Sequence, residues 1–582
     1  MAGPGSKCSM FQIAISPALV LLPLLALALP TEATQGSSRE QRGQVEAGRR
    51  LYMEGLRPSG QPLRATLQGD IQMEGVQFRC RSCHQGSGFG SNEAAGVVFP
   101  ITAAALYQPR RWRRGDNIRK LYQEVQPRAY AGRLRDPRAR SAYTDETLAR
   151  ALREGLDADG HSMDPMMPRY ELDDDEMAAL IAYIKTIEPS GAPGVDQEEL
   201  HLATVITADT PPAQAKAVVD VLEAYVERKN RYVENEFARP GHSPYYKNDF
   251  YSAYRRWVLH VWRLSGPMVD WRKRLDAYYR EQPVFAVVGG ASPGSWASVH
   301  DFCEAQRVPC LFPLTDLPVV SQEGDWTVYF SRGITLEAES LGHFLRQTRH
   351  GAVLQVSDTG PKAAVAVHAL AASLQDAPGL SLERATFPSS PADPADAHGA
   401  AGVSGRWQRL LAEHRPRTLV LWLEHVALEP LAEAIAKSGR AVDVVLSSGV
   451  FGDALPTHIP ASMAGHVLAT YPYALPGDRD FDTLRIRAWL NSRGVARQQE
   501  RSQLATYFAA SIVDHALVHI VDNFSRPFFL EEVEHEAEQG LTQSVYPHLS
   551  LGPGQRFASK GCYLVRLVDG QPIEPVSDWI VP

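Results

Sequence analysis

Two cysteines and a histidine in the run Cys80-Arg81-Ser82-Cys83-His84 constrain this chain more than any other feature. Because the thiols are three positions apart, both can reach the vinyl groups of one porphyrin, and the next residue then lies beneath the iron as an imidazole ligand. A zinc site would need a second Cys/His pair at ligand spacing, and a redox dithiol would need a βαβ context; neither is found nearby. The motif therefore predicts one covalent haem c, attached by Cys80 and Cys83 and ligated by His84.

The first residues have the pattern of an export signal. Lys7 gives a positive start, residues 11 to 29 are almost wholly apolar, and Thr31-Glu32-Ala33 offers small residues for cleavage. We therefore predict a signal peptide at residues 1–33 and a periplasmic location for the mature chain. The apolar run is near the shortest length that spans a bilayer, so an uncleaved N-terminal membrane anchor is the alternative.

Helical periodicity is found on both sides of the haem motif. A helical pattern begins at Val45, and apolar residues recur at helical spacing from Leu148 to Leu152 and from Met177 to Ile184. Thr144 is suited to cap the helix before Leu148, and Gly155 is suited to end it. We therefore predict a helical domain around the motif.

The motif, the terminal helices and the loop between them resemble class I c-type cytochromes over residues 44–190. The resemblance implies an all-α cytochrome c domain that exchanges one electron with a periplasmic redox partner, such as a dehydrogenase or another cytochrome. It also implies that Met167 is the second axial ligand, because a thioether raises the potential of the iron and suits electron transfer. His161, Met163 and Met166 lie in the same loop and are the competing ligands.

A strongly basic stretch lies between the motif and this loop. Residues 110–140 contain eleven Arg and Lys residues and three Asp and Glu residues. One hypothesis is that this surface steers an acidic redox partner. The alternative is a solvated face, with one or two arginines on the haem propionates. The net charge of the whole chain is -8, which argues against a general nucleic-acid binder.

The character of the sequence changes after a linker at residues 191–198. Short apolar runs then alternate with helical stretches up to residue 582, which predicts parallel sheets covered by helices, and the length suits two lobes. The aromatic-rich segment from Tyr245 to Tyr279 is interpreted as core packing or as an insertion that covers a lobe. The apolar runs are residues 202–206, 284–288, 309–312, 327–330, 352–356, 419–423, 442–446 and 467–470.

Three of these stretches, Val284–Ser292, Val328–Thr335 and Val442–Ser448, resemble type I periplasmic binding proteins of the branched-chain amino-acid receptor group. The resemblance implies that residues 199–582 form a two-lobed α/β domain with a small solute closed between the lobes. A membrane permease is then an alternative partner. Receptors for amino acids commonly have an aromatic residue after the strand that corresponds to the one ending at Asp358. This chain has Thr359-Gly360-Pro361 there, which argues against an amino-acid ligand.

Polar residues at the ends of the predicted strands are the candidate solute ligands. A turn at residues 290–294 is predicted to enter a helix near Ser295, where backbone N–H groups and the hydroxyls of Ser292 and Ser295 would hold an anion. Ordinary turn and helix-cap duty is the alternative. Further strands end at Ser357 and at Ser447, so their polar residues are expected in the same cleft. The six candidates are Ser292, Ser295, Ser357, Asp358, Ser447 and Ser448.

The sequence has no motif from which we predict an enzymatic site. Neither a phosphate-binding loop nor a nucleophile elbow stands out. Cys303 and Cys310 flank a predicted helix-to-strand junction, and either a disulfide or two thiols would fit an exported protein. We therefore expect an electron carrier fused to a solute-binding or partner-docking domain. The alternatives are a receptor of an uptake system with an accessory haem domain, and the electron-transfer subunit of a dehydrogenase.

Overall fold

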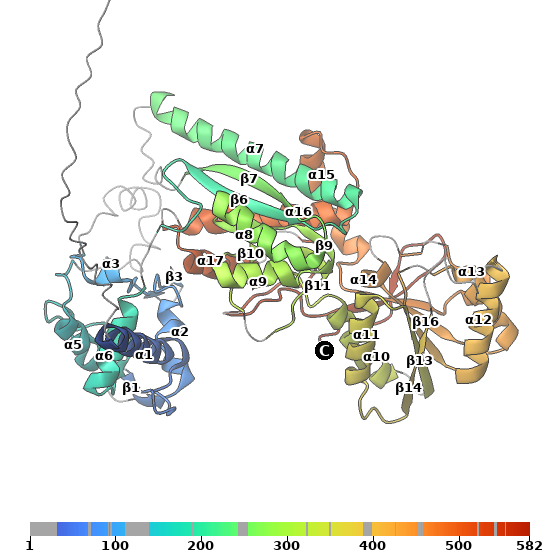
Figure 1. Cartoon of the computed structure of the whole chain (residues 1–582), viewed down its shortest axis with the longest axis horizontal. Coiled ribbons are helices and arrows are strands. Elements are labelled where there is room, and N and C mark those ends of the chain that lie inside the picture. The colour runs from blue at the N-terminus through green and yellow to red at the C-terminus, as the bar shows by residue number, and fades with distance from the viewer. Residues whose placement is uncertain are drawn as a thin grey trace, which may run out of the picture. The chain divides into compact units, whose positions relative to one another are not determined.

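The computed structural model describes residues 32–582 except 68–70, 91, 94–95, 111–138, 188–190, 243–253, 322–323, 349–350, 388–398, 425, 452–454, 457, 521–522, 540–543 and 553. The chain forms two compact units. The first consists of residues up to Ser82 and Tyr107–Thr186, and the second of Cys83–Leu106 and Ile187–Pro582 (Figure 1). The predicted signal sequence lies almost wholly outside the described residues. Within the described part of the chain, no helix has the length and apolarity needed to cross a bilayer.

Close packing of two helices builds the first unit. Helix α1 (Glu32–Glu54) lies against α6 (Asp174–Ile184). A Cβ atom on Gly48 of α1 would lie 2.0 Å from the carbonyl oxygen of Ala179, so only glycine permits this approach. One turn further on, the rings of Tyr52 and Tyr183 are 5.3 Å apart. The interface of α1 and α6 is therefore set by a small residue next to an aromatic pair.

Local signals fix the ends of the next helix, α5 (Asp145–Glu154). The Thr144 hydroxyl accepts a hydrogen bond from the backbone N–H of Thr147, and the Thr147 hydroxyl in turn accepts from the N–H of Thr144. Gly155 ends the helix in the left-handed region at φ 74°. Both predicted boundaries of this helix are confirmed.

The first unit is not wholly helical. A small antiparallel sheet has the order β2 (Ile71–Glu74), β1 (Arg64–Leu67), β5 (Arg169–Tyr170). The expectation of an all-α domain therefore needs correction. β1 and β2 alternate polar and apolar residues, but these strands have only two to four residues, which is too short a run to indicate a strand in the sequence.

The second unit begins with a parallel sheet. Its strands run in the order β7 (Arg256–Arg263), β6 (Glu199–Ile206), β8 (Ala286–Val288), β10 (Cys310–Leu311) and β12 (Thr327–Val328), and β9 (Ala291–Ser295) and β11 (Leu314–Leu317) continue beside β6. Helices α7 (Pro212–His242) and α16 (Glu500–Ile520) cover one face, and α8 (Trp271–Glu281) and α9 (Ala297–Gln306) cover the other (Figure 1). Trp257, Trp262 and Trp271 are buried, which favours the core-packing interpretation of the aromatic segment.

A second sheet follows with the order β14 (Leu380–Thr386), β13 (Gly351–Ser357), β15 (Thr418–Trp422), β16 (Asp443–Ser447), β17 (Val467–Tyr471), β18 (Tyr563–Arg566) and β19 (Glu574–Pro575). The first five strands are parallel and the last two antiparallel. Helices α10 (Ile334–Thr348) and α11 (Pro361–Ser373) cover one face, and α12 (Gly399–His414) and α13 (Leu428–Ser438) cover the other (Figure 1).

The chain passes three times between the two sheets. It leaves the first sheet after β12, and after β17 it continues through α15 (Pro476–Ser492) to α16, which packs against α7 and β8. After α17 (Arg526–Gln539) it returns to the second sheet as β18. Each of the eight predicted apolar runs overlaps a strand. The predicted anion-binding turn at residues 290–294, however, is replaced largely by strand β9, whose backbone pairs with β6 and β11.

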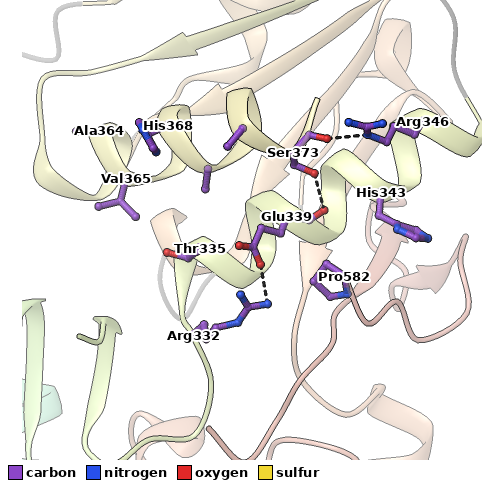
Figure 2. A pocket seen from close by; sticks show the side chains of 12 residues that line it. Arg332, Thr335, Glu339, His343, Arg346, Ala364, Val365, His368, Ser373 and Pro582 are labelled. Carbon is purple, nitrogen blue, oxygen red and sulfur yellow. Dashed lines mark hydrogen bonds and ion pairs between the residues drawn. The ribbon is translucent and has the colours of Figure 1, made fainter. Parts of the chain in front are cut away.

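Two cavities of the second unit lie beside its helices. One, of about 870 Å³, is lined by α10, α11 and Pro582 (Figure 2). Its charged side chains already have partners: Arg332 lies 2.6 Å from Glu339, and Arg346 donates to the carbonyl oxygen of Ser373. The other, of about 840 Å³, follows α8. Neither is lined by any of the six candidate solute ligands.

Candidate functional site

The haem motif forms one helical turn. Cys80 directly precedes the short helix α2 (Arg81–His84), which contains Cys83 and His84. Neither cysteine forms a disulfide; Cys80 is buried and Cys83 is exposed. The division between the compact units falls between Ser82 and Cys83, inside this turn. The turn therefore presents the residue types that covalent attachment requires, at the spacing that it requires.

The His84 side chain is prepared to ligate a metal through one nitrogen. It is 9 % exposed, and its Nδ1 lies 3.1 Å from the carbonyl oxygen of Phe99, to which it donates as the neutral tautomer. Burial lowers the pKa of His84 to about 4, although the bond to Phe99 acts in the opposite direction. The imidazole is therefore neutral at physiological pH, and its orientation is fixed by the partner of Nδ1, as in proteins that ligate metals through Nε2. The residues present fit a haem iron.

Glycines close the loop that follows His84. The N–H of Gly90 donates to the His84 carbonyl oxygen at 3.1 Å. Gly90 has φ 80°, and a Cβ atom there would lie 2.1 Å from the carbonyl oxygen of Val98. The chain can therefore double back to Phe99 only with glycine at this position.

Within the second unit, helix α17 holds the same loop. The backbone N–H of Ser87 donates to Glu531 at 2.9 Å, and the Ser87 hydroxyl donates to the other carboxylate oxygen. The rings of Phe89 and Phe528 are stacked with centroids 4.5 Å apart. At the start of α17, the buried Arg526 donates only to backbone carbonyl oxygens and a tyrosine hydroxyl. The loop that follows His84 is thus held by a helix that is itself bonded to the backbone of the second unit.

The loop that contains Met167 is fixed within the first unit. The Tyr170 hydroxyl donates to the carbonyl oxygen of Phe78 at 2.8 Å, which ties the loop to the chain two residues before Cys80. Arg169 donates to the carbonyl oxygen of Met167. Met163 and Met167 are half-buried, whereas the side chain of Met166 is 62 % exposed. Burial therefore favours Met167 or Met163 over Met166 as an iron ligand.

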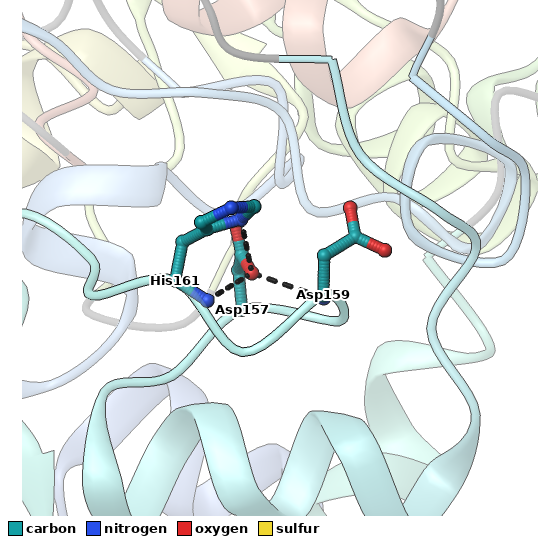
Figure 3. Close-up of side chains that lie close together, drawn as sticks. All are labelled: Asp157, Asp159 and His161. Atoms are coloured by element: carbon teal, nitrogen blue, oxygen red, sulfur yellow. Dashed lines mark hydrogen bonds and ion pairs between the residues drawn. The ribbon is translucent and has the colours of Figure 1, made fainter.

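His161, another competing ligand, lies in an acidic cluster. Its Nδ1 is 3.4 Å from Asp157, whose carboxylate also accepts the backbone N–H groups of Asp159 and His161 (Figure 3). A loop with the same backbone bond occurs earlier in the chain. The N–H of Arg57 donates to the Gln61 carbonyl oxygen at 2.8 Å, just as the N–H of Asp157 donates to the His161 carbonyl oxygen at 2.8 Å. Because the earlier loop has no acids at the matching positions, the acids are not required for the shape of the loop. Sequence reasoning missed this repeated loop, which the sequence Glu-Gly-Leu at residues 54–56 and 154–156 indicates.

The basic stretch lies mainly outside the described residues. Of its eleven cations, the structure describes Arg110 and Arg140, whose backbones form a bridge, with the N–H of Arg110 2.9 Å from the Arg140 carbonyl oxygen. The Arg140 guanidinium lies 4.3 Å from the ring centre of Tyr143.

Cys303 and Cys310 are free thiols, both fully buried at the junction of α9 and β10.

Three of the six candidate solute ligands, Ser292, Ser295 and Asp358, form side-chain hydrogen bonds within their own segments. The Ser292 hydroxyl donates to the Ser295 carbonyl oxygen at 3.4 Å, and the Ser295 hydroxyl accepts the N–H of Ala297 at the start of α9. Ser357 ends β13, and the Asp358 carboxylate accepts the N–H of Gly360 at 2.8 Å. These contacts are turn and cap duty, the alternative that the sequence left open.

The remaining two candidates, Ser447 and Ser448, lie together at the end of β16 and are fully buried. The Ser447 hydroxyl donates to the Glu337 carboxylate at 2.8 Å. Sequence reasoning missed Glu337, which lies 110 residues earlier in the chain. The available signal was that Glu337 falls on the apolar stripe of its helix, three residues after Ile334 and four before Leu341.

Comparison with known proteins was informative for the first part of the chain. Residues 73–188 match the family model for cytochrome c. The matched segment contains the haem motif, α5, the loop of Met167 and α6, so the chain contains a cytochrome c domain. The cytochrome c resemblance seen in the sequence is confirmed. No match was found in a comparison with curated proteins.

Solved structures similar to the chain are substrate-binding proteins. A fatty acid ABC transporter substrate-binding protein from Thermomonospora curvata is 14 % identical, with a TM-score of 0.44 over 67 % of this chain and 94 % of that one. A putative branched-chain amino acid ABC transporter from Rhodospirillum rubrum is also 14 % identical, with a TM-score of 0.44 over 65 % and 100 % of the two chains. These identities and TM-scores are low, so the function is inferred from the residues of this chain.

Proposed function

We propose that the protein is an exported monohaem cytochrome c that transfers one electron at a time, fused to a small-solute-binding or partner-docking domain. The observation that supports this most is the buried, neutral His84 within Cys80-Arg81-Ser82-Cys83-His84, with its Nδ1 bonded to Phe99. Residues 44–190 would form the cytochrome domain, 191–198 the linker and 199–582 the binding domain.

Four residues would hold the haem. Cys80 and Cys83 would attach it, and His84 and Met167 would ligate its iron. When bound, the haem supplies a one-electron couple. The protein contributes the remainder: the bond to Phe99 orients the imidazole, and the bond from Tyr170 to Phe78 holds the Met167 loop to the chain just before Cys80. Ligation by both His84 and Met167 would suit an electron carrier rather than an enzyme.

The second part of the chain would act as a binding module. Two mainly parallel sheets, each covered by helices and joined by three crossings of the chain, support a two-lobed module. Ligands of such sheets bind at the carboxyl ends of the strands. A periplasmic dehydrogenase or another cytochrome would be the redox partner. The alternative is an uptake receptor with a membrane permease as partner, which tight solute binding by the full chain would favour.

A reductive titration of the exported protein tests the electron-carrier function. We expect the visible spectrum to change through one reversible transition that consumes one electron per chain, because a single motif holds a single haem. The His84→Ala variant is the control, since it keeps both thiols but loses the ligand, and its potential should shift. The absence of a reversible couple, or several couples, would contradict the proposal.

A further inference from the structure

A buried carboxylate occupies the carboxyl edge of the second sheet. Glu337, in the first turn of α10, is 2 % exposed. Its Oε2 accepts hydrogen bonds from the hydroxyls of Ser447, at 2.8 Å, and Thr470, and its Oε1 accepts the backbone N–H of Gly449 at 2.9 Å. Ser447 ends β16 and Thr470 belongs to the neighbouring strand β17. The donors thus come from two strands and the short helix α14 (Ser448–Phe451), and α10 supplies only the carboxylate.

These donors are shaped around the carboxylate. A Cβ atom on Gly449 would lie 2.6 Å from the Glu337 Oε1, so glycine is needed for the approach. Ser448 is fully buried between Ser447 and Gly449, and its hydroxyl has no hydrogen-bond partner among the described residues. Buried hydroxyl groups normally have a partner. One polar group of this edge is therefore left over after Glu337 has been bound.

The nearest ion pair connects the two sheets beside this site. Lys362, at the start of α11, lies 2.6 Å from Asp316 of β11, and its Nζ is 3.5 Å from the carbonyl oxygen of Gly449. The ammonium group of Lys362 thus lies near Gly449, whose N–H binds Glu337, and cations are common in sites that bind carboxylate ligands. The charge of Asp316 is balanced by Lys362, so the donors around Glu337 remain suited to one negative charge.

We propose that the ends of β16 and β17 form a carboxylate-binding site, and that Glu337 of the same chain occupies it. A solute with a carboxylate group would bind there only after the Glu337 side chain had left. The proposal rests on the assignment of residues 199–582 as a binding module. It explains why Ser447, a candidate solute ligand, bonds a residue of its own chain. The ligand class is a small organic acid.

The Glu337→Ala variant tests the site with acetate as the probe. The substitution removes two carbons and two oxygens, and acetate consists of the same heavy atoms. We expect acetate to raise the melting temperature of this variant by roughly 2–4 °C more than chloride does at equal ionic strength. Acetamide, which has a similar shape without the charge, should have a smaller effect.

Two controls separate this effect from a general salt effect. Glu339→Ala removes a carboxylate from the same helix that pairs with Arg332 at 2.6 Å, and it should not respond to acetate. Glu337→Gln fills the site with an isosteric side chain and should not respond either. Equal responses of all variants would overturn the proposal, as would an alanine variant that refolds in neither salt. Haem content, measured on the same samples, reports separately on the cytochrome function.

Discussion

At the scale of single residues, one histidine and one methionine are proposed to ligate the haem iron. Cys80, Cys83 and His84 could be predicted from the sequence because they are close together in the chain. Phe99, the partner of His84, could not, since it lies 15 residues further on and contributes a backbone carbonyl oxygen. Met167 was predicted by resemblance, and it stays a prediction. Its loop offers four candidate ligands within seven residues, and the sequence alone does not order them by burial.

The Met167→His variant tests the second axial ligand. An imidazole in place of the thioether should lower the reduction potential of the haem, because methionine ligation raises it. A potentiometric titration measures the change. Met166→His is the matched control, since that side chain is 62 % exposed, and its potential should stay that of the parent. If the reduction potential shifted only in the Met166 variant, Met166 and not Met167 would be the ligand, and the assignment of Met167 would be wrong.

Glu337 gives a second prediction at this scale. Burial raises the pKa of Glu337 from 4.5 to about 7, and the charge of Asp316 adds to this rise. The hydrogen bonds that Glu337 accepts act in the opposite direction. Since the folded protein binds this proton more tightly than the unfolded chain, the stabilisation is complete below about pH 4.5 and is lost as the pH rises through 7. The loss is about 3 kcal/mol for this shift.

Urea unfolding of the parent and of Glu337→Gln, on either side of this pH range, checks that prediction. The parent should lose stability between acidic and slightly alkaline pH, and the glutamine variant should lack this part of the dependence. Lys362, Asp316 and Cys562 lie around the carboxylate and are unchanged in both proteins. Identical pH profiles would show that Glu337 does not titrate in this range.

The Glu337 site also shows where prediction from sequence ends. Ser447 could be predicted as a buried polar residue at a strand end, because strands and their ends have a local signature. Its partner Glu337 could not, since Glu337 lies 110 positions before Ser447 and 133 positions before Thr470 in the chain. Only the folded sheet brings these three side chains together.

At the scale of elements, the sequence predicts strands that are buried on both faces better than strands that are short or polar. Each apolar run became a strand, because burial on both faces demands continuous apolar residues. β9 was expected to be a turn, since its sequence Ala-Ser-Pro-Gly-Ser is typical of turns, and its pairing with β6 and β11 overrides that preference. β7 was not predicted, because its residues lie in a segment interpreted only by its aromatic content.

The packing of α1 on α6 gives a prediction for a single glycine. Gly48→Ala should destabilise the first unit by roughly 1–3 kcal/mol, because its Cβ would lie 2.0 Å from the carbonyl oxygen of Ala179. Gly43→Ala on the same helix is the control, since nothing lies within 4 Å of that position, and helix propensity favours alanine there. Thermal unfolding followed at the haem absorption compares the two. Equal melting temperatures would contradict the described helix contact.

At the scale of the whole molecule, the chain combines a cytochrome c domain with a module of two helix-covered parallel sheets. Composition and motif order were sufficient to predict this combination. The residues of the binding site were not, because Ser292, Ser295 and Asp358 form turn or cap contacts within their own segments. The docking surface proposed for the basic stretch stays a hypothesis, since most of that stretch lies outside the described residues.

Mass spectrometry of the mature protein, purified from a periplasmic extract and denatured, is the most direct test of what we propose. We expect a chain that has lost about its first 33 residues and that retains the mass of one haem after denaturation, because two thioether bonds survive unfolding. The Cys80→Ser/Cys83→Ser variant should show the unmodified mass. An unmodified mass for the parent, from cells that mature other c-type cytochromes, would contradict the assignment of the chain as a haem protein.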